Sequence, residues 1–164
     1  MGLTVEDFDF NNTINVNKTW GYNNRMEVGF GPTKNEQSIR TIDVDEITMS
    51  KFEELCKSMN INTPYRLVFY SAGSKYKVIS NTNANKLLRK KLIDLGIKPI
   101  TIHGLRHTHA CVMLYKKVSI YYVSERLGHK DIQTTLKDYS HVTKELRSED
   151  AKVTTAIFGN MLSA

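Results

Sequence analysis

Apolar and polar residues alternate along the first 44 residues in the way that β-strands require. The alternation is clear at residues 14–16 and 26–30, and it returns at residues 38–44. A period of two places every second side chain on the same face of a sheet. These segments predict a small antiparallel sheet whose last turn, residues 33–35, presents Lys34 at an exposed tip.

Beyond residue 44 the apolar spacing becomes that of helices, with start and stop signals at the expected places. Asp45 and Ser119 are suited to be N-caps, and Gly96 and Gly128 are suited to end helices. The predicted helices span residues 45–59, 84–95, 102–116, 119–127 and 131–137, and residues 144–164 show weaker helical spacing. The pattern predicts an α+β fold that is mainly helical, with a small N-terminal antiparallel β-sheet.

Length, charge and cysteine content narrow the class of protein. A chain of 164 residues is about one domain, and no apolar run is long enough to span a bilayer. Residues 1–10 resemble the entry to a strand rather than a secretory leader. The formal charge of +6 favours a polyanionic partner such as nucleic acid. Cys56 and Cys111 lack the spacing of a disulfide framework or a thiolate metal site, which favours a reduced, cytoplasmic setting.

The candidate chemistry lies near the end of the chain. His103 and Arg106 fall in one arc of a predicted helix, and the opposite arc, which is expected to face the core, holds Ile102, Leu105, Val112 and Met113. His129 and Tyr139 each follow the end of a helix. A phenol that attacks a phosphodiester needs cationic and N–H donors for the charged oxygens, which Arg106, His103 and His129 can supply. It also needs an acid for the departing 5'-oxygen, and Lys34 on its turn is suited to that role. These residues predict phosphoryl transfer through a tyrosyl intermediate.

Ordered sequence boxes connect these residues to a family. The chain carries His-x-Leu-Arg-His-Thr-x-Ala at residues 103–110, Val-Ser-x-Arg-Leu-Gly-His at 123–129 and Thr-Thr-Leu-x-x-Tyr-Ser-His at 134–141. An earlier segment, residues 33–40, reads Thr-Lys-Asn-x-x-Ser-x-Arg. In this order and spacing the chain closely resembles the tyrosine recombinases, also called the phage integrase family, from its first strand to its tail.

The resemblance implies a role for each candidate. Tyr139 is expected to form a 3'-phosphotyrosyl link, Arg106 and His103 to bind the scissile phosphate, His129 to assist, and Lys34 to act as general acid. No metal or nucleotide cofactor is implied. The expected partners are double-stranded DNA and, in the full-length protein, further copies in a tetramer, with no membrane. The tail at residues 144–164 is expected to pack onto a neighbouring protomer.

One feature of the family was not found. Its members carry another phosphate-binding arginine, in a Gly-x-Arg-x-x-Glu segment on a helix before the first strand, whereas this chain opens at Met1-Gly2-Leu3-Thr4. Arg25 and Arg40 both fall in the sheet region and are poor substitutes. The resemblance therefore predicts most of a catalytic domain, residues 1–164, cut from a longer integrase without its first helix and N-terminal DNA-binding domain.

Other readings stay open at this point. The chain could be a DNA-binding integrase remnant without catalysis, or a type IB topoisomerase that uses related chemistry without recombination. The pair His103 and His107 could in principle hold zinc, but no His-Glu-x-x-His pattern or third ligand accompanies it. We expect His107 to hydrogen-bond near the site and His109 to pack inward.

The remaining tyrosines and one basic helix face are less clearly assigned by the sequence. Tyr115, Tyr121 and Tyr122 are expected to be buried tyrosines with satisfied hydroxyl groups. A basic helix face could be either an ordinary solvated surface or one that contacts phosphates. Its members are Lys86, Arg89, Lys90 and Lys91.

Overall fold

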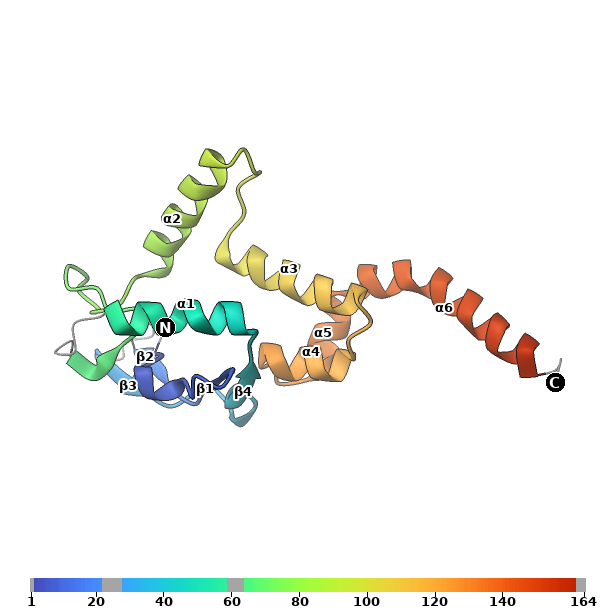
Figure 1. Cartoon of the computed structure of the whole chain (residues 1–164), viewed down its shortest axis with the longest axis horizontal. Helices are drawn as coiled ribbons and strands as arrows, with labels where there is room; N and C mark the ends of the chain where they lie inside the picture. The colour runs from blue at the N-terminus through green and yellow to red at the C-terminus, as the bar shows by residue number, and fades with distance from the viewer. Residues whose placement is uncertain (1, 22–27, 59–63, 162–164) are drawn as a thin grey trace. The chain divides into compact units, whose positions relative to one another are not determined.

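The computed structural model describes residues 2–21, 28–58 and 64–161, and it divides into two compact units. The first unit, Met1–Ile102, holds the strands and the first two α-helices, and the second, His103–Ala164, holds the rest (Figure 1). Length alone had suggested a single compact unit. The fold class matches the predicted one, α+β and mainly helical with small antiparallel β structure near the N-terminus.

Within residues 2–21 and 28–58 the strands form two separate two-stranded sheets, where one sheet was predicted. Strand β1 (Thr13–Val16) pairs with β4 (Arg40–Asp43), and β2 (Thr19–Gly21) pairs with β3 (Gly29–Gly31), both antiparallel. The segment between β3 and β4 contains Pro32 and the short 3-10 helix η2 (Glu36–Ser38). Because this segment is not a tight turn, β3 and β4 each pair with another strand rather than with each other.

The N-terminal segment contains a 3-10 helix where the start of a strand was predicted. Helix η1 (Val5–Asp7) is stabilised by the Asp7 carboxylate, which accepts hydrogen bonds from the backbone N–H of Thr4 at 2.7 Å and from its hydroxyl at 2.9 Å. The ammonium of Lys18 pairs with the same buried carboxylate. A buried charge that is paired and hydrogen-bonded in this way is tolerated in the core.

The helices of the first unit lie where they were predicted, although the second begins at residue 81 rather than 84. Helix α1 (Glu46–Ser58) begins after Asp45, whose carboxylate accepts the backbone N–H of Thr48 at 2.9 Å. Helix α2 (Asn81–Asp94) begins after Ser80, which accepts the backbone N–H of Asn83 at 3.2 Å. A further 3-10 helix, η3 (Pro64–Arg66), precedes α2. Two small clusters form the core of this unit: Phe8, Ile14, Met49 and Val68, and Trp20, Leu67 and Val78.

The second unit is built from four helices, three of them close to the predicted spans. They are α3 (Ile102–Tyr115), α4 (Ile120–Leu127), α5 (Ile132–Asp138) and α6 (Ser140–Met161). Helix α6 begins at residue 140, several residues before the predicted tail helix. The core of the unit comprises Ala110, Leu114, Val123, Leu127, Tyr139 and Val142.

The face of α3 that packs on this core differs in part from the predicted one. Ile102, Leu105, Val112 and Met113 were expected to lie toward the core; Met113 packs against it, but the other three are exposed. The buried residues are Ala110 and Leu114, which follow His107 at helical spacings of three and seven residues. The same face of the helix therefore carries the buried residues Ala110 and Leu114 and the candidate site residue His107.

Three tyrosines also differ from expectation. Tyr115, Tyr121 and Tyr122 were predicted to be buried, and all are exposed. Cys56 and Cys111 are both half-buried. Among the described residues no helix is long and apolar enough to cross a membrane.

Candidate active site

Tyr139 lies at the junction between two helices and inside the core of the second unit. It ends α5, where its backbone N–H still donates to the Thr135 carbonyl at 3.0 Å, and α6 starts at the next residue. Its side chain is only 1% exposed. The phenol oxygen lies 3.0 Å from Nδ1 of His107, within hydrogen-bonding distance. The hydroxyl of a buried tyrosine is thus paired with an imidazole.

The surroundings of Tyr139 favour the protonated phenol. Burial raises its pKa above the ordinary value, the nearby Arg106 guanidinium lowers it, and Cys111 and Asp138 raise it further. The net direction is upward. At neutral pH the group is therefore a neutral phenol, which must lose its proton if it is to attack a phosphorus atom.

Arg106 reaches the end of the neighbouring helix from α3. One terminal nitrogen of its guanidinium donates to the main-chain carbonyl of Leu127 at 2.6 Å. Leu127 is the last residue of α4, where helical carbonyls lack partners within the helix and the helix dipole favours a positive charge. A guanidinium carries five N–H donors, so this contact fixes its position without using up its donors.

His129 is positioned by a glycine turn. Gly128 adopts a left-handed conformation, with φ of 67°, and its N–H donates to the Glu125 carbonyl at 2.8 Å. The chain then turns so that Nδ1 of His129 lies 2.7 Å from the hydroxyl of Thr135, which is completely buried. This contact sets the orientation of the imidazole ring.

The histidines of α3 occupy different environments. His103 is exposed, and its ring meets that of His107 edge to face, with centroids 4.5 Å apart. His109 was expected to pack inward, but it is exposed and accepts the Nε–H of Arg126 at 3.1 Å. Partial desolvation and the charge of Arg126 both lower the pKa of His109. His107 hydrogen-bonds at the site, as predicted.

Lys34 belongs to the first unit. It is exposed, as predicted, and lies between β3 and η2. The adjacent Asn35 is held by two contacts, since its carbonyl accepts the Thr33 hydroxyl at 3.0 Å and its side chain accepts the Ser38 hydroxyl at 2.6 Å. Lys34 thus projects from an ordered turn, and its part in the chemistry remains a prediction.

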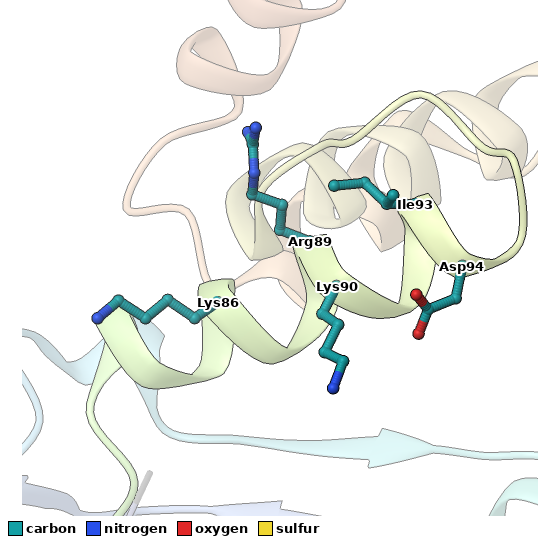
Figure 2. Close-up of a pocket in the computed structure, with 5 residues that line it drawn as sticks. All are labelled: Lys86, Arg89, Lys90, Ile93 and Asp94. Atoms are coloured by element: carbon teal, nitrogen blue, oxygen red, sulfur yellow. The ribbon is translucent and has the colours of Figure 1, made fainter.

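Helix α2 presents a separate basic surface in the first unit. A shallow open hollow of about 260 Å³ is lined by Lys86, Arg89, Lys90, Ile93 and Asp94. Figure 2 shows the three cationic side chains extending outward from the helix in different directions. All three residues, and the neighbouring Lys91, are exposed. A surface of this kind fits an extended anion better than a single small one.

Comparison with known families agrees with the sequence boxes. A sequence model described as the phage integrase family matches residues 1–145. The chain belongs to the phage integrase family.

Other members of the family resemble it over most of its length. The integrase of Staphylococcus phage L54a is 28% identical over 159 residues, which cover 91% of this chain and 45% of that integrase. The tyrosine recombinase XerA of Pyrococcus horikoshii is 32% identical over 122 residues, covering 73% of this chain and 42% of XerA. The chain thus spans less than half the length of these two curated relatives.

Solved structures of family members share the fold. The Tn1549 transposon integrase in complex with circular intermediate DNA superimposes with a TM-score of 0.73, at 21% identity, over 93% of this chain and 53% of that one. The crystal structure of XerA recombinase gives a TM-score of 0.66, at 21% identity, over 91% of this chain and 50% of that one. At this identity the likeness concerns the fold alone.

The second unit of this integrase-family chain brings together four of the five predicted site residues. His103 and Arg106 come from α3, His129 follows α4, and Tyr139 ends α5. Sequence reasoning missed Thr135, the hydroxyl partner of His129. The sequence did carry a signal for it. Thr135 belongs to the box at residues 134–141, and it lies six residues after His129 in the next predicted helix, where its hydroxyl could meet the imidazole.

Proposed function

We propose that these residues form the catalytic part of a site-specific DNA recombinase of a phage or other mobile element. The single observation that supports this most strongly is the gathering of Arg106, His129 and Tyr139 in one small unit, with the tyrosine oxygen bonded to an imidazole. A compact set of phenol, guanidinium and imidazole groups is suited to stabilise a phosphoryl-transfer transition state. The longer lengths of its relatives support assigning residues 1–164 to part of a longer integrase.

The proposed reaction is a transesterification. The Tyr139 oxygen attacks the scissile phosphorus, a new bond forms to the 3'-phosphate, and the bond to the 5'-oxygen breaks. Arg106, with His103 and His129, stabilises the charge on the non-bridging oxygens. Lys34 donates a proton to the leaving 5'-oxygen. Rejoining reverses these steps with a different 5'-hydroxyl, so that no external energy source is needed.

The proposed partners are double-stranded DNA and further copies of the protein. Four solved structures of a related integrase are complexes with DNA. The apolar residues exposed on helix α6 support association with further copies of the protein, because a partner surface could cover them. These residues are Val153, Ile157 and Phe158. We propose that the tail at residues 144–164 packs onto a neighbouring protomer within a tetramer on DNA. The natural setting is then the cytoplasm, where the DNA substrate is.

Covalent capture of DNA tests the proposal. A nicked suicide substrate releases a short fragment after cleavage, so the enzyme stays attached to the DNA through tyrosine. We expect a protease-sensitive, detergent-resistant complex with the full-length protein that contains these residues. Burial of Tyr139 is the observation that favours a non-catalytic DNA-binding role instead. Salt-sensitive binding without any covalent complex would support that second function.

A DNA-binding experiment at several salt concentrations tests whether the basic face of α2 contacts phosphates. Changing both Arg89 and Lys90 to Gln should weaken DNA binding for all sequences and reduce the slope of log K against log salt by about 2, the value expected when two phosphate contacts are lost. The matched control changes Lys51 and Lys57 of α1, exposed lysines that pair with glutamates on their own helix. Equal slopes for both double variants would show that α2 is an ordinary solvated surface.

A further inference from the structure

The proposed reaction assigns an acid for the leaving group but no acceptor for the phenol proton. Tyr139 is a neutral phenol, so its attack on phosphorus requires that the proton go elsewhere. An acceptor must lie within about 2.6–3.2 Å of the hydroxyl to serve as general base. Nδ1 of His107, at 3.0 Å, meets this condition.

Other groups of the second unit are less suited to take the proton. The Arg106 guanidinium has no lone pair to offer, and its terminal nitrogen is bonded to the Leu127 carbonyl. Nδ1 of His129 is engaged with the Thr135 hydroxyl. Asp138 precedes Tyr139 in the chain and is exposed, while the phenol is buried.

The ring of His107 is also held in a defined orientation. His103 packs against it edge to face at 90°, and the centroid of the Tyr139 ring lies 5.5 Å from that of His107. His107 itself is half-buried on the stripe of α3 that carries the core residue Ala110. A ring in contact with two aromatic neighbours is restricted in its rotation, which keeps its acceptor nitrogen aimed at the hydroxyl.

We infer that His107 is a catalytic residue that accepts the Tyr139 proton as the phenol oxygen attacks the DNA phosphate. The inference rests on the proposed function. The proton moves from the phenol to Nδ1, the oxygen–phosphorus bond forms, the bond to the 5'-oxygen breaks, and that oxygen takes a proton from Lys34. His107 ends as an imidazolium and returns its proton when the DNA is rejoined. The reactive tautomer carries its hydrogen on Nε2.

A substrate with sulfur in place of the bridging 5'-oxygen separates the two proton transfers. A thiolate leaves without protonation, so the sulfur substrate needs no acid but still needs a base. We expect His107→Asn to lower cleavage of ordinary DNA by about 10²–10⁴-fold. Asparagine keeps an acceptor oxygen near the position of Nδ1 but takes no proton. Cleavage of the sulfur substrate should recover in Lys34→Ala and stay low in His107→Asn.

The control is His109→Asn, two residues along the same helix, exposed and bonded to Arg126. It should cleave both substrates like the unaltered protein. Unimpaired cleavage by His107→Asn, or recovery of that variant on the sulfur substrate, would overturn the inference. So would an increase in cleavage, which would identify the contact as a lock that keeps the phenol buried.

A second measurement does not depend on cleavage. Long-range ¹H–¹⁵N spectra of the 164-residue chain resolve the tautomers of its five histidines. We expect Nδ1 of His107 to be unprotonated and its signal to shift in Tyr139→Phe. A hydrogen on Nδ1 would overturn the inference even if the variants fail to fold. If Tyr139→Phe still captures DNA, Tyr139 is not the nucleophile and the proposed reaction fails; if only the His107 tests fail, the proposed reaction through Tyr139 stands.

Discussion

We expect Tyr139→Phe to abolish covalent capture of DNA. Loss of a catalytic nucleophile typically lowers the rate by a factor on the order of 10⁶, which brings cleavage to background. Phenylalanine fills the same space among Ala110, Leu114 and Val142, so the core of the second unit should survive. The variant loses the hydrogen bond to His107, and leaving a partly buried acceptor without its partner costs about 1–3 kcal/mol.

The measurement is a denaturing gel of reactions on a nicked suicide substrate, with binding and thermal unfolding measured in parallel. Tyr121→Phe is the matched control, because Tyr121 lies in the same unit and is 73% exposed. It should capture DNA normally. A covalent complex with the Tyr139→Phe protein would mean that another residue is the nucleophile, and mapping the attached peptide would identify it.

The environment of Tyr139 illustrates what sequence can and cannot predict about this site. The residue order and spacing predicted that Tyr139 follows a short helix, and the structure places it at the end of α5. Its burial and its contact with His107 depend on how α3 packs against α5, which spacing within either segment does not encode. The long-range contact is a product of tertiary packing.

Helix α3 also shows that spacing within one segment does not determine how that segment packs. Its span was predicted within one residue, but its buried face was predicted only in part. Leu105, Val112 and Met113 lie across from the polar arc of the helix, so helical geometry pointed to them as core residues. Of these, Met113 packs against the core while Leu105 and Val112 are exposed, and the residues that are fully buried are Ala110 and Leu114.

The prediction of a single sheet was wrong for a related reason. Alternation identified strand-forming segments, but pairing depends on the path between them. Residues 32–39 contain a 3-10 turn, so β4 pairs with β1 from much earlier in the chain. Helix ends were predicted better, since Asp45, Gly96 and Gly128 carry their signal within a few residues of the end.

Arg106 should have separable effects on stability and on catalysis. Arg106→Ala removes a charged donor from the Leu127 carbonyl, which should destabilise the second unit by about 1.5–3 kcal/mol, and it should lower cleavage by at least 10²–10³-fold. It also removes the positive charge that lowers the pKa of Tyr139, so the pKa of the phenol should rise further above its ordinary value.

Arg106→Lys distinguishes the two effects. Lysine restores a positive charge that can reach the end of α4, so most of the lost thermal stability should return. Its ammonium lacks the planar fork that binds two phosphate oxygens at once, so cleavage should stay well below that of the unaltered protein. Unfolding curves and single-turnover cleavage rates measure the two effects separately. Arg126→Lys on α4, whose arginine bonds to His109, is the control and should change neither. If Arg106→Lys restores cleavage together with stability, the guanidinium serves to hold α3 against α4, and the phosphate-binding role belongs to another residue.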